Sequence, residues 1–367
     1  MKKSLLALAV LGAYAGVASA QSSVTMYGTL DMAGTYVKND GTAKRLSLST
    51  NGVNSSQLGF RGVEDLGGGL KAGFNLIAEL ARSDAGSVGN GTGDKFFSRR
   101  STVSLFTNAG ELRLGRDYTP TFWNLTIFDA FGTNGVGSTL NPRQLYQGTR
   151  QDNSIGYFLP SNIGGFYGQL MTAAGEGGTS GDRPGTYVGG RLGFAAGPFD
   201  IAAAYGEVKY DLAANVTGTT GIGQLVPIAP GSKQKIGNVG GSWDFGFFKL
   251  MGYYDHEKIP NASEDFWSIS ANFPFGQSEF RFGYDESKLD RTAAGTVDSK
   301  VKQFKATYGY NLSKRTLLYA SASVLDNDSA TRLMVLGGTG QGNSIPSGNM
   351  TAGGKSKGAQ FGIRHFF

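Results

Sequence analysis

The chain has 367 residues, no cysteine and 58 glycines, and its 34 basic and 28 acidic residues give a formal charge of +6. Lysine and arginine are scattered along the chain rather than concentrated in one stretch, which argues against a nucleic-acid partner. An exported chain of this length without disulfides needs a large hydrogen-bonded framework. Its 24 phenylalanines and 16 tyrosines, with only 10 prolines, favour many short strands.

The N-terminus has the pattern of a secretory signal peptide. Lys2 and Lys3 precede a short apolar run, and Ala18-Ser19-Ala20 forms a small-x-small cleavage site. A membrane anchor is the alternative, but the run is short for a spanning helix of ~20 residues. We predict a signal peptide over residues 1–20, export through the periplasm, and a single domain over residues 21–367.

Apolar and polar residues alternate with period two directly after this segment, as in a half-buried strand. In residues 24–36, Val24 and Met26 share one face with Leu30, while Thr25 and Asp31 share the other. We expect further strands near residues 57–61, 71–80, 153–159, 166–174, 187–196, 199–209, 236–245, 247–257, 266–273, 279–285, 303–311, 314–325 and 358–367.

The connections between these strands alternate in length. Short connections at one end and long polar ones at the other are typical of an outer-membrane β-barrel. With two more strands on either side of the short connection near 108–110, the count is sixteen. We therefore predict an all-β fold, a sixteen-stranded antiparallel transmembrane barrel. The short connections are expected near 64–69, 108–110, 160–165, 197–198, 245–247, 274–277 and 312–314, and the long ones near 38–55, 83–94, 175–186, 210–235, 258–264, 289–299 and 327–357.

A soluble β-sandwich would show the same alternation, with the polar face turned outward. The C-terminus favours the barrel, because Phe361, Ile363 and Phe367 share one face of a strand that ends with the chain. An open sheet edge in hydrocarbon leaves backbone groups unpaired, at several kcal/mol each. We expect these three residues to serve barrel closure and assembly, with the last strand pairing to the first.

The alternation stops between Gly115 and Asp152. A segment of this length without a regular period is usually either functional or disordered. This one carries apolar side chains such as Trp123, Phe128 and Leu140, which favour burial. We therefore predict a loop over about 115–152 that folds inward against the surrounding wall.

Several short motifs, in order, resemble the trimeric general-diffusion porins of Gram-negative outer membranes. They are VTMYGTLD (24–31), QLGFRGVEDLGGG (57–69), LRLGRDY (112–118), FDAFG (128–132), QDNSIGY (151–157) and the terminal GIRHFF. The resemblance covers essentially the whole chain after the signal peptide. It implies a homotrimer of sixteen-stranded barrels, each narrowed by its third loop.

The resemblance also implies a pore constriction with basic side chains on the wall opposite acidic groups on the loop. Gln57 departs from this pattern, because many family members carry arginine there. Arg99 and Arg100 are adjacent, so a regular strand would place only one of them on the lumen face, and Arg99 is favoured. Asp129 is the leading loop carboxylate, although its side chain could instead cap the backbone of the loop. The expected basic residues are Arg61, Arg99, Arg150, Arg116, Arg143, Arg100 and the neutral Gln57, and the acidic ones are Asp129 and Asp117.

The expected function is a passive channel for small hydrophilic solutes and ions, in contact with lipid and lipopolysaccharide. Arginines outnumber loop carboxylates, which favours anions. A substrate-specific porin for one sugar or small anion is the alternative. We expect no enzyme, because Gly354–Gly358 matches G-x-S-x-G without the strand-to-helix context of a nucleophile. We expect no cofactor or metal site, although external carboxylates could bind divalent cations: Asp182, Asp290, Asp298, Asp326 and Asp328.

Overall fold

The computed structural model describes residues 23–80, 95–145, 148–175, 185–209, 232–291, 298–328, 331–336 and 350–367. The predicted signal peptide over residues 1–20 lies outside this part of the chain.

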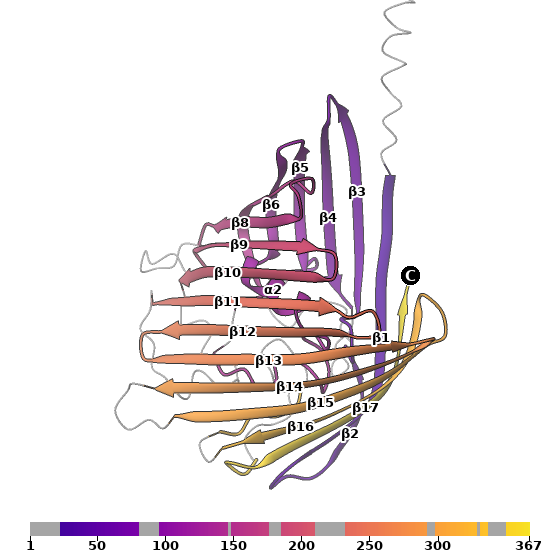
Figure 1. Ribbon diagram of the computed structural model, residues 1–367, viewed down its shortest axis with the longest axis vertical. Helices are drawn as coiled ribbons and strands as arrows, with labels where there is room; N and C mark the ends of the chain where they lie inside the picture. Colours follow the sequence, from indigo (N-terminus) through magenta and orange to yellow (C-terminus); the bar gives the residue numbers. More distant parts are fainter. Residues whose placement is uncertain are drawn as a thin grey trace, which may run out of the picture.

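Strands make up most of the described chain (Figure 1). No helix within these residues is long and apolar enough to span a bilayer. The one described helix is α2 (Pro120–Ile127). The strands are β1 (Ser23–Asn39), β2 (Arg45–Thr50), β3 (Gln57–Gly67), β4 (Leu70–Glu79), β5 (Arg100–Thr107), β6 (Gly110–Tyr118), β7 (Arg150–Phe158), β8 (Phe166–Ala173), β9 (Tyr187–Ala196), β10 (Phe199–Lys209), β11 (Lys233–Asp244), β12 (Lys249–Ile259), β13 (Ala262–Phe275), β14 (Ser278–Arg291), β15 (Ser299–Asn311), β16 (Thr316–Asn327) and β17 (Lys355–Phe366).

The strands form one closed antiparallel sheet in chain order. The last strand, β17, pairs with β1 from Thr29↔Phe366 to Asn39↔Ser356, as predicted from the C-terminus. On its other side β1 pairs with both β2 and β3, which lie end to end. The seventeen segments of the described chain therefore occupy sixteen places, and the predicted sixteen-stranded barrel is confirmed.

The two faces of the sheet have the inverted polarity of a membrane barrel. On β14 and β15, Phe282 and Phe304 are exposed, whereas Asp285 and Gln303 are fully buried. The same pattern occurs on β1, where Leu30 is exposed beside a buried Asp31. A soluble sandwich would expose its polar face, so this alternation excludes it.

The predicted alternation of short and long connections is found, with two exceptions. Residues 258–264 are not a loop, because Ile259 pairs with Ala262 across a two-residue turn. Their polar sequence belongs to strand ends. Residues 38–55 contain β2, whose outward Leu46 and Leu48 form too short an alternation to be recognised.

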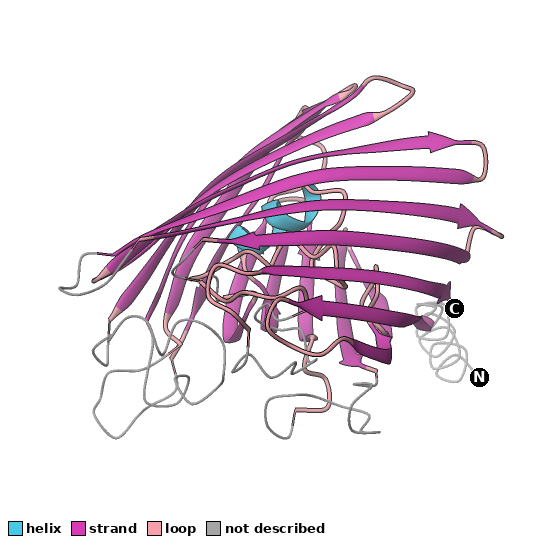
Figure 2. Ribbon diagram, turned by 90° about the horizontal axis from the view of Figure 1, so that it is seen from below, coloured by secondary structure: helices cyan, strands magenta, loops and turns pink. Residues whose placement is uncertain are grey.

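The segment between β6 and β7 begins with α2. Thr119 caps this helix by accepting a hydrogen bond from the Phe122 backbone nitrogen at 3.3 Å, and Pro120 occupies the first turn, where no amide donor is needed. The helix contacts β8, β9, β10 and β11, and Figure 2 shows it, in cyan, within the curve of the sheet.

Candidate functional site

An aromatic cluster holds α2 and the residues that follow it. Phe122, Leu125 and Phe128 are buried together with Tyr253 and Phe266 of the wall. Such a cluster removes several large apolar side chains from water, at ~1.5–3 kcal/mol for each one fully buried. The segment is therefore fixed by packing as well as by hydrogen bonds.

The polar contacts of α2 reach strands far away in the sequence. The Asn124 amide donates to the Ala202 carbonyl at 3.2 Å and to the Asn238 side chain at 3.0 Å. Arg191 of β9 donates to the Asn124 side-chain oxygen. These partners are inward-facing groups of β9, β10 and β11, so the helix lies on the polar face of the wall.

Arg143 is the most deeply buried charge of the segment. Its guanidinium lies 2.8 Å from Asp255, contacts Glu257, and lies 3.4 Å from Glu264; none of these four side chains is exposed. The Phe266 ring lies 4.5 Å from the guanidinium carbon. Burial alone would lower the pKa of Arg143, but the three carboxylates raise it well above its ordinary value, so the charge is retained.

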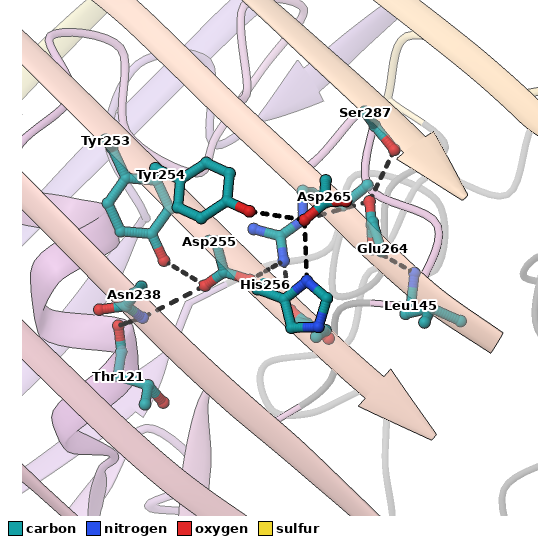
Figure 3. A network of polar contacts seen from close by, with 12 residues as sticks. Thr121, Leu145, Asn238, Tyr253, Tyr254, Asp255, His256, Glu264, Asp265 and Ser287 are labelled. Carbon is teal, nitrogen blue, oxygen red and sulfur yellow. Dashed lines mark hydrogen bonds and ion pairs between the residues drawn. The ribbon is translucent and has the colours of Figure 1, made fainter. Parts of the chain in front are cut away.

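The backbone beside Arg143 is held by the same wall. The Gln144 and Leu145 nitrogens donate to the Glu264 carboxylate at 2.9 and 2.7 Å. Figure 3 shows Asp255 and Glu264 extending from neighbouring strands, with Ser287 bonded to Glu264. The prediction that Arg143 lines the pore is therefore wrong, because its charge is enclosed by the wall.

Asp129 is also buried rather than exposed at the tip of the loop. Its carboxylate accepts hydrogen bonds from the Gly132 nitrogen at 2.6 Å and the Thr139 hydroxyl at 2.6 Å. Lys305 of β15 lies 3.2 Å away, between Asp129 and Asp285, and all three side chains are fully buried. The alternative, a carboxylate that caps the loop's own backbone, describes Asp129 correctly.

A basic cluster surrounds Tyr118 at the end of β6. The Tyr118 hydroxyl accepts hydrogen bonds from Arg99 at 3.3 Å and from Arg150 at 3.1 Å. The Arg150 and Arg100 guanidinium carbons lie 4.5 and 5.3 Å from the centre of the tyrosine ring. Tyr118 itself stacks on Phe122 with ring centres 5.1 Å apart, which ties the cluster to α2.

Arg99 and Arg100 both lie against Tyr118, although a regular strand would place adjacent residues on opposite faces. β5 begins at Arg100, so strand alternation does not govern Arg99, which precedes it. Asp117 is likewise not an exposed acidic group. It is buried and pairs with Arg100 at 2.7 Å and with Arg113 at 2.5 Å.

The other residues predicted for the basic wall have neighbours of their own. Arg116 is in register with Ser101, contacts the Ser98 carbonyl and Asp152, and lies near enough to Arg150 for their charges to interact. Arg61 lies nearer the β3–β4 turn, with its guanidinium 5.4 Å from the Tyr27 ring centre. Gln57 is in register with Glu79 on β4, and Glu79 lies 3.8 Å from Arg99.

Two kinds of functional residue were missed by sequence reasoning. The first is a set of wall carboxylates that hold the loop, Asp255, Glu257 and Glu264. The alternation of Asp255 and Glu257 with the exposed Tyr254 along β12 was a usable signal for an inward acidic face. The second is a further set of inward arginines, Arg113, Arg191, Arg281 and Arg364.

The carboxylates proposed for divalent cations have protein partners. In the described residues, no group of three or more His, Cys, Asp or Glu side chains is arranged so that it could hold a metal ion. Asp290 pairs with Lys288 at 2.9 Å and Asp326 with Lys355 at 2.8 Å. Asp298 accepts from the Arg291 nitrogen and Asp328 from the Lys300 nitrogen, while Asp182 lies outside the described residues.

Comparison with known proteins places this barrel in a family. A family model described as Gram-negative porin matches residues 7–330. The chain belongs to the Gram-negative porin family. Outer membrane porin protein 32 of Delftia acidovorans is 38% identical to this porin over 384 residues, spanning 100% of both chains. An outer membrane porin protein of Bordetella pertussis is 28% identical over 390 residues, spanning 89% of this porin and 95% of that protein.

Solved structures agree with the assignment. An anion-selective porin from Comamonas acidovorans matches with a TM-score of 0.77 at 35% identity, covering 95% of this porin and 100% of that chain. OmpT of Vibrio cholerae, at 15% identity, has the same fold, with a TM-score of 0.67. This porin is a protein of the Gram-negative outer membrane.

The buried position of Asp129 leads to a prediction. In an Asp129→Asn variant of this porin, we expect the ion selectivity to stay at the wild-type value, because the carboxylate does not face the solvent. The free energy of unfolding should fall by about 1–3 kcal/mol, because charge-assisted hydrogen bonds within the loop are weakened. Reversal potentials and denaturant unfolding measure the two effects. A marked gain in anion preference would instead mean that the Asp129 carboxylate faces the pore constriction.

Proposed function

We propose that this porin is a diffusion channel that prefers anions over cations. The observation that carries the proposal is the arginine cluster around Tyr118. In the described residues, Arg99, Arg100 and Arg150 each have one buried nitrogen without a hydrogen-bond partner. The side chains of all three arginines are partly exposed, so their charges act on a passing anion, whereas Asp129 and Asp117 are neutralised by protein cations.

The electrostatics of a narrow aqueous neck support this preference. Walls of low dielectric focus the field of the charges that line such a neck. Arginine stays protonated at any physiological pH, so the field does not depend on a titration. The similarity to the anion-selective porin from Comamonas acidovorans supports the same conclusion.

The loop between β6 and β7 is proposed to narrow the lumen. Its contacts run along the polar faces of successive strands: Asn124 bonds to β10, Arg143 to β12 and Asp129 to β15. The Val136 nitrogen donates to the Gln360 side chain of β17 at 2.9 Å. The open path for solutes then lies between this loop and the inner faces of β3 to β7. The Tyr118 cluster lies on this side of the barrel.

Two further kinds of partner, other copies of the chain and lipopolysaccharide, are suggested by the family and by the outer face of the barrel. We propose a homotrimer, as the resemblance implies, and cleavage of a signal peptide after Ala20. Lysines on the exposed face of the strand ends near the long loops provide charges for the phosphates of lipopolysaccharide. They include Lys233, Lys235, Lys258, Lys288, Lys300, Lys302, Lys355 and Lys357, several of them also paired with wall carboxylates.

Uptake by reconstituted vesicles tests the proposal with solutes of matched size. Gluconate, sorbitol and N-methylglucamine share a six-carbon chain and differ in charge. We expect uptake to be fastest for gluconate and slowest for N-methylglucamine. Fastest uptake of the cation would refute anion preference, and saturation by a single solute at low concentration would favour a substrate-specific porin. Conductance that rises in three equal steps would support the trimer.

A further inference from the structure

The wall is interrupted beside β1, where residues 51–56 separate β2 from β3. We infer that this short segment is a second constricting element, which faces the lumen and completes the neck together with the β6–β7 loop. The inference rests on the proposed diffusion path through the barrel. It adds a set of pore-lining residues on the side where β1 and β17 close the wall.

The interruption between β2 and β3 is an ordered feature that is held by its own hydrogen bonds. The Asn51 nitrogen donates to the Asp31 carbonyl at 3.1 Å. The Ser56 hydroxyl accepts from the Asp31 nitrogen at 3.0 Å and donates to the same carbonyl at 3.1 Å. These bonds replace the strand-to-strand hydrogen bonds at Asp31. The chain therefore departs from the wall here while the backbone groups of Asp31 stay paired.

Asn51 forms the turn at which the chain leaves the barrel wall after β2. Its φ is 63°, a left-handed conformation that asparagine adopts more readily than most residues. Its side-chain oxygen also accepts from the Ser56 nitrogen at 2.6 Å, which closes the segment at its other end. The conformation of residues 51–56 is therefore determined locally.

The segment turns toward the inside of the barrel. Asp31 is fully buried on the inner face of β1, and its carboxylate accepts from the Val53 and Asn54 nitrogens at 2.8 and 2.7 Å. Arg364 of β17 donates to the Asn54 side chain at 3.1 Å. Tyr319 of β16 also bonds to Asp31. Residues 51–56 therefore cover the inner faces of three strands.

The segment also touches the β6–β7 loop. The Ser55 hydroxyl donates to the Asn134 side chain at 3.0 Å. A Cβ atom added to Gly135 would lie 1.8 Å from the Gly52 carbonyl oxygen, so the two backbones are in close approach. The loop and the segment thus form one continuous lining, with Asn54 and Ser55 half-buried and Arg364 held beside them.

Single cysteines test this placement, because the native chain contains none. The variant Asn54→Cys would be reconstituted in planar bilayers and treated with an anionic (sulfonatoethyl) or a cationic (trimethylammonium ethyl) methanethiosulfonate. We expect either adduct to lower single-channel conductance by roughly one-third, since both narrow the path. The anionic adduct should reduce anion preference, and the cationic adduct should not.

Leu48→Cys is the matched control, because Leu48 precedes the segment and is 64% exposed on the outer face. Its treatment should leave the conductance and the selectivity unchanged. Ser55→Cys provides a second position if Asn54→Cys fails to fold. Labelling that changes neither quantity, or a cysteine that reacts only after unfolding, would overturn the inference. An untreated variant that still conducts with anion preference leaves the proposed function standing in either case.

Discussion

Replacing Arg143 by methionine is expected to lower the free energy of unfolding by about 3–5 kcal/mol, because buried carboxylates then lose their positively charged partner. Asp255, Glu257 and Glu264 would face one another without the guanidinium that now lies among them. Denaturant unfolding of the folded protein in detergent measures the loss. The same change should release the β6–β7 loop, so single-channel recordings should show larger current noise than the wild type.

Two comparisons separate the buried contact from a general effect of charge. Lys288→Met removes an exposed pair with Asp290 and should leave the free energy of unfolding essentially unchanged, because exposed ion pairs contribute little. Adding Glu257→Gln and Glu264→Gln to Arg143→Met should recover part of the lost stability, because less buried negative charge remains. Wild-type stability and wild-type noise in Arg143→Met would mean that this contact does not hold the loop.

Neutralising the Tyr118 cluster is the second change with a large expected effect. In an Arg99→Gln, Arg150→Gln double variant, we expect conductance at low salt to fall several-fold, with a much smaller loss at high salt. The field of the arginines raises the local anion concentration only where the Debye length is long, ~30 Å at 0.01 M against ~3 Å at 1 M. Single-channel conductance across this range of potassium chloride concentration measures the effect.

Arg116→Gln is the matched control, because it removes the same charge close to the cluster but from a guanidinium that a carboxylate already neutralises. Arg116 pairs with Asp152, and its side chain is 21% exposed. Its conductance should follow the wild type at every salt concentration. If the double variant and this control show the same salt dependence as the wild type, the cluster does not focus anions.

The barrel could be predicted from the sequence because the patterns that specify it are local. Period-two alternation, the short turns and the C-terminal Phe361, Ile363 and Phe367 are each visible within a few residues. Strand pairing between neighbours then follows from the chain order. The interruption at residues 51–56 was hidden inside a predicted loop, because the alternation of β2 is only six residues long.

The roles of the charged loop residues could not be predicted, because their partners are far away in the sequence. Arg143 meets Asp255 across 112 positions, and Lys305 meets Asp129 across 176. Whether such a charge faces water or a counter-ion depends on the register of distant strands. The family pattern suggested acids on the loop and bases on the wall, whereas at Arg143 the wall supplies the acids.

We propose that the basic cluster around Tyr118 sets the ion preference of the channel. The zero-current potential of the wild-type porin across a potassium chloride gradient tests it most directly. We predict a potential whose sign shows chloride crossing faster than potassium, and a value closer to zero in the Arg99→Gln, Arg150→Gln variant. A wild-type potential with the sign of potassium selectivity would contradict the claim.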